Sequence, residues 1–227
     1  MNGDRTPSAG RYLDAVLDVA ARAGATQQRA IVAAARAVAD TVAAGGRWWV
    51  FGTGHSHLLV EELWGRAGGM VDVHPILEPS LMLHEGLLKS SLLERLPGLA
   101  PVLLELHPMT AGDCLLVISN SGRNAVPVEL AEQAARRDVT VIALTSLSHT
   151  ESVTSRAPSG RMLAEVADLV IDNCGVPGDA ILPYRQGAVG ATSTEVGAML
   201  LQALSVEVIA ELERRGRPAR TLTSVNA

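Results

Sequence analysis

The sequence is poor in lysine and in aromatic side chains. Lys89 is its one lysine, against 18 arginines, and six of the 227 residues are aromatic. A Walker-type nucleotide site needs the sequence Gly-Lys-Ser/Thr, and no glycine precedes Lys89, so this class of site is excluded. A net charge of −5 and so few aromatic rings argue against binding to the phosphate backbone or bases of nucleic acid. We therefore expect no nucleic-acid partner.

Extended apolar segments are also absent, although 48% of the residues are hydrophobic. The longest stretch without Asp, Glu, Lys or Arg is 48–60, shorter than the roughly 20 residues of a membrane-spanning helix. Residues 1–10 contain no apolar segment of a secretory signal. We expect a cytoplasmic protein that does not enter the membrane. Cys114 and Cys174, at opposite ends of the sheet proposed below, should both be reduced.

Short apolar runs alternate with segments of helical periodicity. Strands are predicted at 48–51, 70–76, 114–118, 140–144 and 168–171, and helices at 56–66, 87–106, 125–137 and 194–215. Two Ala-rich leading helices, at about 12–23 and 26–44, precede the first strand, with Gly24 and Gly45 as their ends. Strands that are apolar on both faces and separated by helices form a parallel sheet covered on both sides. We predict one α/β domain over 1–227, a three-layer α-β-α sandwich with a five-stranded parallel sheet in the flavodoxin-like order 2-1-3-4-5.

This strand order places the first strand beside the third, where ligands of open parallel sheets bind. The turn after the first strand reads Gly52-Thr53-Gly54-His55-Ser56 and leads into a helix, so its N–H groups and the helix N-terminus suit an anion. A dinucleotide site would need a third glycine where the chain has His57, which argues against a Rossmann cofactor.

The turn after the third strand, 119–124, reads Ser-Asn-Ser-Gly-Arg-Asn and is a second cradle for oxyanions. A third hydroxyl cluster, 192–194, precedes the final helix. One such cluster is usually a helix cap, but three at the strand ends or helix starts of one sheet indicate a phosphate site built from hydroxyl and N–H groups. Arg123 could help to hold the phosphate or could pair with Glu129.

Three segments, FGTGHS, VISNSGRNAVPVELAEQA and VTVIALTS, resemble the SIS (sugar isomerase) domain, whose members bind phosphosugars. The similarity runs in order over about 30–212, and the turn at 119–124 is its most specific part. The segments SRAPSGRMLAEVAD and ADLVIDNCGVPGDA look like a bacterial branch of this family that is similar to an N-acetylglucosamine 6-phosphate dehydratase.

The resemblance implies roles for individual residues. The segment EELWGR at 61–66 is similar to the Glu-Glu-Leu-x-Gly-Arg of bacterial phosphoheptose isomerases, in which the second glutamate is the catalytic base, so it implies Glu62 as the base. The implied phosphate contacts are Ser56, Ser119, Ser121 and Asn124, with Ser193 or Thr194, and the turns themselves add Gly54, Asn120, Gly122 and Arg123. Phosphoheptose isomerases carry a Gln-Glu-x-x-His pattern on their last helix, in which the histidine is the second acid/base. The last helix of this sequence has no histidine, which puts heptose isomerisation in doubt.

Glu62 follows His55 by seven residues, about 10 Å along a helix and on nearly the same face. A sugar phosphate held at the helix start could place C1 and C2 beside this carboxylate. Removal of the C2 proton gives an enediolate, or its amide-substituted equivalent for an N-acetyl sugar. Reprotonation of this intermediate at C1 is isomerisation, and loss of the C3 hydroxyl is dehydration. His55 and His84 are candidates for the accompanying acid.

We predict a phosphosugar enzyme, most specifically an N-acetylglucosamine 6-phosphate dehydratase; an aldose–ketose isomerase and a non-catalytic phosphosugar sensor are alternatives. Family regulators carry a helix-turn-helix, for which the residues before Trp48 are too few, and this favours the enzyme. No metal or cofactor is expected, because His55 and His57 have no third ligand at a suitable spacing. A homo-oligomer, dimer or tetramer, is expected from the apolar leading helices and from the resemblance.

Overall fold

A five-stranded parallel sheet forms the centre of the computed structural model, which describes residues 6–224. Its strands are β1 (Trp48–Gly52), β2 (Val73–Ile76), β3 (Cys114–Ile118), β4 (Thr140–Thr145) and β5 (Leu169–Asp172). They are hydrogen-bonded in the order β2-β1-β3-β4-β5, which confirms the predicted topology. Every residue of β1 and β3 is buried, as expected for central strands of a sheet covered on both faces.

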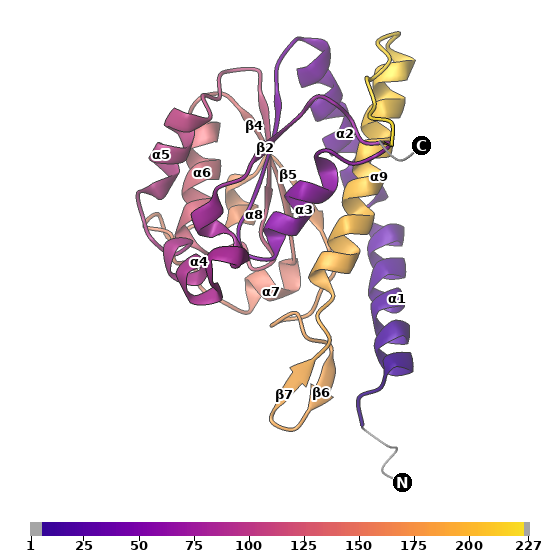
Figure 1. Cartoon of the computed structure of the whole chain (residues 1–227), viewed down its shortest axis with the longest axis vertical. Helices are drawn as coiled ribbons and strands as arrows, with labels where there is room; N and C mark the ends of the chain where they lie inside the picture. The colour runs from indigo at the N-terminus through magenta and orange to yellow at the C-terminus, as the bar shows by residue number, and fades with distance from the viewer. Residues whose placement is uncertain (1–5, 225–227) are drawn as a thin grey trace.

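Helices cover both faces of the sheet (Figure 1). One layer contains α1 (Ala9–Thr26), α2 (Gln28–Ala43), α3 (Ser56–Leu63) and α9 (Ser193–Arg214), and the other contains α4 (Leu87–Leu93), α5 (Leu99–Leu106), α6 (Ala125–Ala135) and α8 (Leu163–Val166). Val50 belongs to the buried cluster under the first layer, and its neighbour Phe51 to the cluster under the second. Successive residues of a strand point to opposite faces, so β1 contributes to both cores.

Smaller elements join these layers. They are the 3₁₀ turns η1 (Pro79–Leu81) and η2 (Leu83–Glu85), helix α7 (Leu147–Glu151), and the hairpin of β6 (Leu182–Tyr184) and β7 (Gly187–Val189). The carboxyl ends of the parallel strands point to the lower side of Figure 1, where α7 lies. The hairpin projects beyond them on the same side.

Several predicted boundaries are wrong. The helix expected at 87–106 is two helices, because Gly98 adopts a left-handed conformation (φ 88°) between α4 and α5. The second strand begins at Val73 instead of residue 70, since Met70 forms an isolated bridge with Thr221. Helix α3 ends at Leu63 and not at residue 66, and the break between α1 and α2 falls at Gln27 instead of Gly24. The β6–β7 hairpin has no counterpart in the prediction, because its strands are short and mostly exposed.

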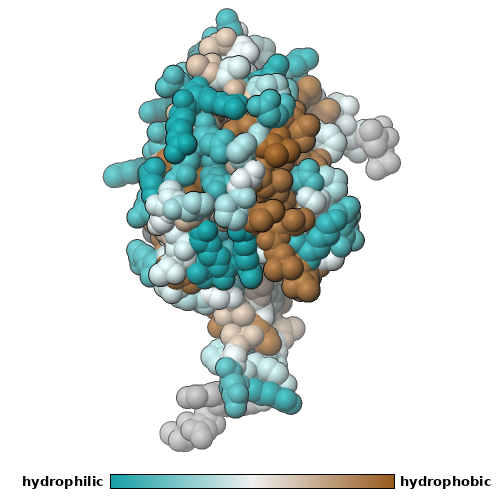
Figure 2. All heavy atoms as spheres, turned by 90° about the vertical axis from the view of Figure 1, so that its left-hand side faces the viewer, coloured by the Kyte–Doolittle hydropathy of each residue, from teal (hydrophilic) through white to brown (hydrophobic). Residues whose placement is uncertain are grey.

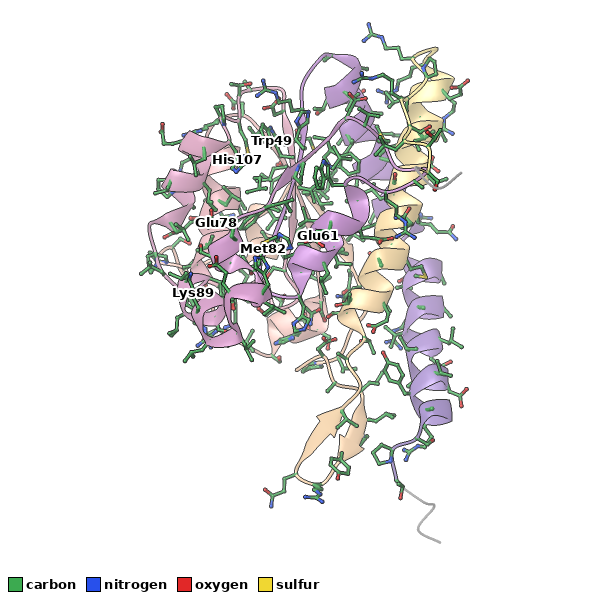
Figure 3. All side chains as sticks on the ribbon, viewed as in Figure 1. Trp49, Glu61, Glu78, Met82, Lys89 and His107 are labelled. Carbon is green, nitrogen blue, oxygen red and sulfur yellow. The ribbon has the colours of Figure 1, made fainter. Side chains whose placement is uncertain are left out.

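Asp113 connects the amino ends of β1 and β3 through hydrogen bonds. Its carboxylate accepts hydrogen bonds from the backbone N–H groups of Arg47 (2.8 Å) and Thr110 (3.1 Å) and from the indole Nε1 of Trp49 (3.0 Å). The Asp113 side chain and the Trp49 indole are both buried, so this donor depends on the carboxylate for an acceptor. Figure 3 shows Trp49 close to His107 beside α5, and their ring centroids are 5.8 Å apart.

Substitution Asp113→Ala is expected to lower the free energy of unfolding by about 2–4 kcal/mol, because it removes the acceptor of three hydrogen bonds, one of which comes from the buried indole of Trp49. Urea unfolding of the variant measures the loss. Asp18→Ala is the matched control, since Asp18 lies exposed on α1, and it should change the midpoint little. Equal midpoints for the two variants would contradict the role given to Asp113.

Candidate functional site

The turns that follow β1 and β3 lie side by side. Gly52, the last residue of β1, pairs in register with Ile118, the last residue of β3, so residues 53–56 and 119–124 leave the same edge of the sheet together. Gly52 also makes room for the first turn. A Cβ atom at this position would stand 2.6 Å from the backbone oxygen of Ser56, so a larger residue would displace the turn.

A cavity of about 260 Å³ lies between the two turns and the helices near them. It is lined by Thr53, Gly54, His55, Ser56, Leu83, Leu87, Ser90, Ser91, Glu94, Ser119, Asn120, Ser121, Asn124, His149, Asp179 and Ser193. Eight of the predicted site residues are among them: Gly54, His55, Ser56, Ser119, Asn120, Ser121, Asn124 and Ser193. Thr194 lines a smaller adjoining recess with Ser56, Asn120 and Ser193. The three hydroxyl-rich segments therefore meet around one space.

The turns carry hydrogen-bond donors that no acceptor in residues 6–224 occupies. These are the backbone N–H groups of His55, Asn120 and Ser121 and the hydroxyls of Ser56 and Ser121. Helices α3 and α6 begin at this edge of the sheet, and neither has a side-chain cap. A helix N-terminus carries about half a positive charge and binds anions. Free donors beside two uncapped helix starts make this cavity suited to an oxyanion such as phosphate.

The N-terminus of α9, by contrast, is already occupied by a carboxylate. Asp179 accepts hydrogen bonds from the backbone N–H groups of Thr192 (3.0 Å) and Ser193 (2.8 Å) and from the Ser193 hydroxyl (2.7 Å). Asp179 has φ of 69°, in the left-handed region. Ser193 therefore lines the cavity with its hydroxyl directed to Asp179.

Other lining residues were also missed by the sequence analysis. The Thr53 hydroxyl donates to the Glu94 carboxylate at 2.7 Å, and the Ser90 hydroxyl donates to the backbone oxygen of Leu81 at 2.8 Å. His149 lies in α7 and is not among the residues that the sequence predicts for the site. Burial lowers the pKa of the His149 imidazole from its ordinary value, Asp179 opposes this shift, and Arg123 adds to it.

Four predicted residues line neither the cavity nor the adjoining recess: Glu62, His84, Gly122 and Arg123. The exposed His84 lies in η2, next to the lining residue Leu83. Gly122 is buried, and a Cβ there would lie 3.2 Å from the Thr145 hydroxyl and 3.3 Å from the Leu163 side chain. Gly122 thus packs the turn against its neighbours and does not face the cavity.

Arg123 does not pair with Glu129, which was one of its two predicted uses. The Glu129 carboxylate instead accepts a hydrogen bond from the backbone N–H of Gly98 at 2.8 Å. The Nε atom of Arg123 is buried and has no partner in the described part of the chain. Arg156 lies next to it: its backbone N–H donates to the Arg123 oxygen, and its side chain donates to the Asn124 amide oxygen at 2.9 Å. Arg123 therefore adds positive charge behind the second turn.

Glu62 lies near the end of α3 and faces α9. Its Oε1 accepts a hydrogen bond from Gln202 Nε2 at 3.0 Å, and its Oε2 pairs with Arg66 at 2.7 Å. The side chain is 24% exposed, so it is neither buried nor directed fully into water. Its role as a base stays a prediction, since the cavity lining reaches the start of α3 but not this residue.

Within residues 6–224, no group of three or more His, Cys, Asp or Glu side chains is placed to hold a metal ion. Cys114 and Cys174 are both free. Among the described helices, none combines the length and apolar character needed to cross a bilayer.

Comparison with known proteins gives two kinds of match. The family model for the SIS domain matches residues 11–146. A UPF0309 protein of Halalkalibacterium halodurans is 47% identical over 193 residues, which cover 84% of this chain and 80% of the relative. A UPF0309 protein of Geobacillus thermodenitrificans is 45% identical over 185 residues, which cover 81% of this chain and 74% of the relative.

Solved structures share the fold at low identity. The phosphoheptose isomerase GmhA from Neisseria gonorrhoeae superposes with a TM-score of 0.59 at 18% identity, covering 88% of this chain and 96% of the other. The Vibrio vulnificus NanR protein complexed with ManNAc-6P superposes with a TM-score of 0.52 at 17% identity, covering 91% of this chain and 62% of the other.

Substitution Asp179→Ala is expected to lower the free energy of unfolding by about 1–2 kcal/mol, because the start of α9 loses its acceptor. Asp179→Asn should lose less, since asparagine keeps an acceptor oxygen and tolerates a left-handed backbone. Denaturant unfolding of both variants measures the difference. An alanine variant as stable as the asparagine variant would show that the carboxylate does not hold this helix start.

Proposed function

Because the chain belongs to the SIS domain family, we propose that it is an enzyme acting on a sugar phosphate. The observation that carries this proposal is the group of unoccupied N–H and hydroxyl donors that two neighbouring turns present to one cavity. A phosphoryl group offers several acceptor oxygens and negative charge, which match these donors and the nearby helix starts. Neutral donors also account for a phosphate site in a chain with one lysine.

In this proposal the phosphate lies between Ser56 and the turn 119–124, with Arg123 adding positive charge behind the turn. The sugar carbons extend from there, and Glu62 on α3 removes the C2 proton. Its pairing with Arg66 and Gln202 would keep the carboxylate oriented until substrate arrives. The electron pair of the C2–H bond becomes the second bond between C1 and C2, and the carbonyl π pair moves onto O1, which gives an enolate that carries the acetamido group at C2. The C1 carbonyl then re-forms and the C3 hydroxyl is expelled; it takes a proton from an acid such as His55 and leaves as water, which completes a dehydration.

The substrate proposed is an amino sugar 6-phosphate, and N-acetylglucosamine 6-phosphate in particular. Its support is the resemblance of SRAPSGRMLAEVAD and ADLVIDNCGVPGDA to the branch described above, together with a structural neighbour that holds the N-acetylated sugar phosphate ManNAc-6P. A cytoplasmic location, which the sequence predicts, suits such a substrate.

Aldose–ketose isomerisation is the second candidate, because phosphoheptose isomerases share the fold. It uses the same first step and ends with reprotonation at C1. A non-catalytic sensor is the third, because NanR shares the fold with a bound phosphosugar.

The oligomer expected from the sequence has a candidate surface. Figure 2 shows hydrophobic residues gathered in a stripe on the side of the molecule that carries α4 and α5. Exposed apolar residues of these helices include Leu87, Leu88, Leu92, Val102 and Leu106. A contiguous apolar stripe on a protein surface marks an interaction site. We propose self-association of the chain, which sedimentation would measure directly.

Incubation with a panel of sugar 6-phosphates in deuterated water tests the function. We expect solvent deuterium at C2 of N-acetylglucosamine 6-phosphate followed by an unsaturated product that has lost water. A ketose would instead identify an isomerase. Binding without any exchange would identify a sensor and would contradict the enzyme proposal.

Glu62→Gln is expected to keep phosphosugar binding and to lose turnover by about 100-fold or more, because the amide cannot accept the proton. Glu61→Gln is the matched control on the same helix, where the side chain is more exposed and pairs with His57. Exchange at C2 measured by NMR compares the variants. Unchanged exchange in the Glu62 variant would remove this residue from the mechanism while leaving the phosphate site intact.

A further inference from the structure

The cavity has four ionisable lining side chains: His55, Glu94, His149 and Asp179. Both carboxylates already have partners, since Glu94 accepts from the Thr53 hydroxyl and Asp179 accepts from the start of α9. His55 belongs to the first phosphate turn and is exposed. His149 is therefore the lining imidazole that lies outside the turns proposed to hold the phosphate.

The position of His149 is fixed by its own helix. Helix α7 starts directly after β4, and the Ser146 hydroxyl oxygen accepts a hydrogen bond from the His149 backbone N–H at 3.2 Å. Ser146 is fully buried, and its hydroxyl donates to the Gly175 oxygen at 2.9 Å. These bonds anchor the residue at the carboxyl edge of the sheet, where the two phosphate turns also lie.

The environment of His149 disfavours the charged form of its imidazole. A charged imidazole must donate hydrogen atoms from both ring nitrogens, and the Nδ1 atom of His149 is buried with no partner in the described chain. Burial lowers the pKa of the His149 imidazole, an effect opposed by Asp179 from the segment after β5 and reinforced by Arg123 from the turn after β3. A neutral imidazole donates through one nitrogen and can serve as a hydrogen-bond donor to a substrate carbonyl.

We propose that His149 is a catalytic residue whose N–H donates a hydrogen bond to the carbonyl oxygen of the open-chain sugar. This assignment rests on the proposed function. When the base takes the C2 proton, the electron pair of the C2–H bond becomes the second bond between C1 and C2, and the carbonyl π pair moves onto O1. The His149 N–H stabilises the negative charge that forms on O1. Both dehydration and isomerisation pass through this step, so the role does not depend on which follows.

Two substitutions separate hydrogen bonding from packing. His149→Phe keeps a ring of similar size and removes the donor, whereas His149→Gln keeps an N–H group. We expect the rate of deuterium exchange at C2 of N-acetylglucosamine 6-phosphate to fall about 100-fold or more in the Phe variant and less in the Gln variant. Affinity for N-acetylglucosaminitol 6-phosphate, which lacks the C1 carbonyl of the open-chain sugar, should change less than threefold in either variant.

His107→Phe is the matched control. His107 is also half-buried with a pKa lowered by burial, but it lies beside Trp49 (Figure 3) and is not among the residues that line the cavity. This variant should exchange C2 hydrogen at the rate of the unaltered chain. If His149→Phe does not fold, the test uses His149→Gln. We then expect a lower rate of deuterium exchange at C2 in this variant, with unchanged affinity for N-acetylglucosaminitol 6-phosphate.

The outcomes separate this inference from the function on which it rests. Normal exchange in the folded His149→Phe variant overturns the role of His149 and leaves the phosphosugar function standing. Equal loss of exchange and of alditol affinity overturns it as well, because the residue would then only shape the cavity. Failure of the unaltered chain to exchange or bind any sugar phosphate overturns both proposals together.

Discussion

The parallel pairing of β1 with β3 is the constraint on which the candidate site depends. These strands are separated by 61 residues of chain, yet their last residues, Gly52 and Ile118, lie in register. Each strand is followed by a polar turn and then by a helix, so the pairing brings two turns and two helix starts to one place. A slip by one residue would move one turn by about 3.3 Å along the strands relative to the other. The register of β1 and β3 therefore fixes the geometry of the polar site at the sheet edge.

The chemistry of the site follows from its donors. Backbone N–H groups and serine hydroxyls carry no full charge, so the cavity lining offers donors to an anion without an arginine or lysine among the lining residues. The helix starts behind the turns supply a field that favours an anion. At α9 the chain's own Asp179 takes the corresponding position, which shows that these helix starts attract a carboxylate where the sequence provides one. A phosphoryl group would satisfy the remaining donors at α3 and α6 in the same way.

Much of this arrangement could be predicted from the sequence, because strands, turns and helix starts leave local signals. Apolar runs separated by helical periodicity predicted the parallel sheet, its strand order was taken from the order common for this pattern, and the Ser and Gly residues marked both turns. The orientation of Glu62 left no such signal, since it depends on packing against Gln202, 140 positions away in the chain. The sequence did not predict His149 and Asp179 as site residues for the same reason: each reaches the cavity through loops whose paths are set by tertiary contacts. The break at Gly98 was missed because Pro97 and Gly98 interrupt a segment whose apolar spacing continues on both sides.

The proposed phosphate site between Ser56 and the turn 119–124 is tested most directly by calorimetric titration. The chain is titrated with N-acetylglucosamine 6-phosphate and with unphosphorylated N-acetylglucosamine, and both titrations are repeated for Ser56→Ala and Ser121→Ala. The account predicts that the phosphorylated sugar binds, that the free sugar does not, and that each alanine variant binds the phosphorylated sugar at least about tenfold more weakly, because each substitution removes a donor to a charged group. Equal affinity for the two sugars, or unaltered affinity in both variants, would contradict it.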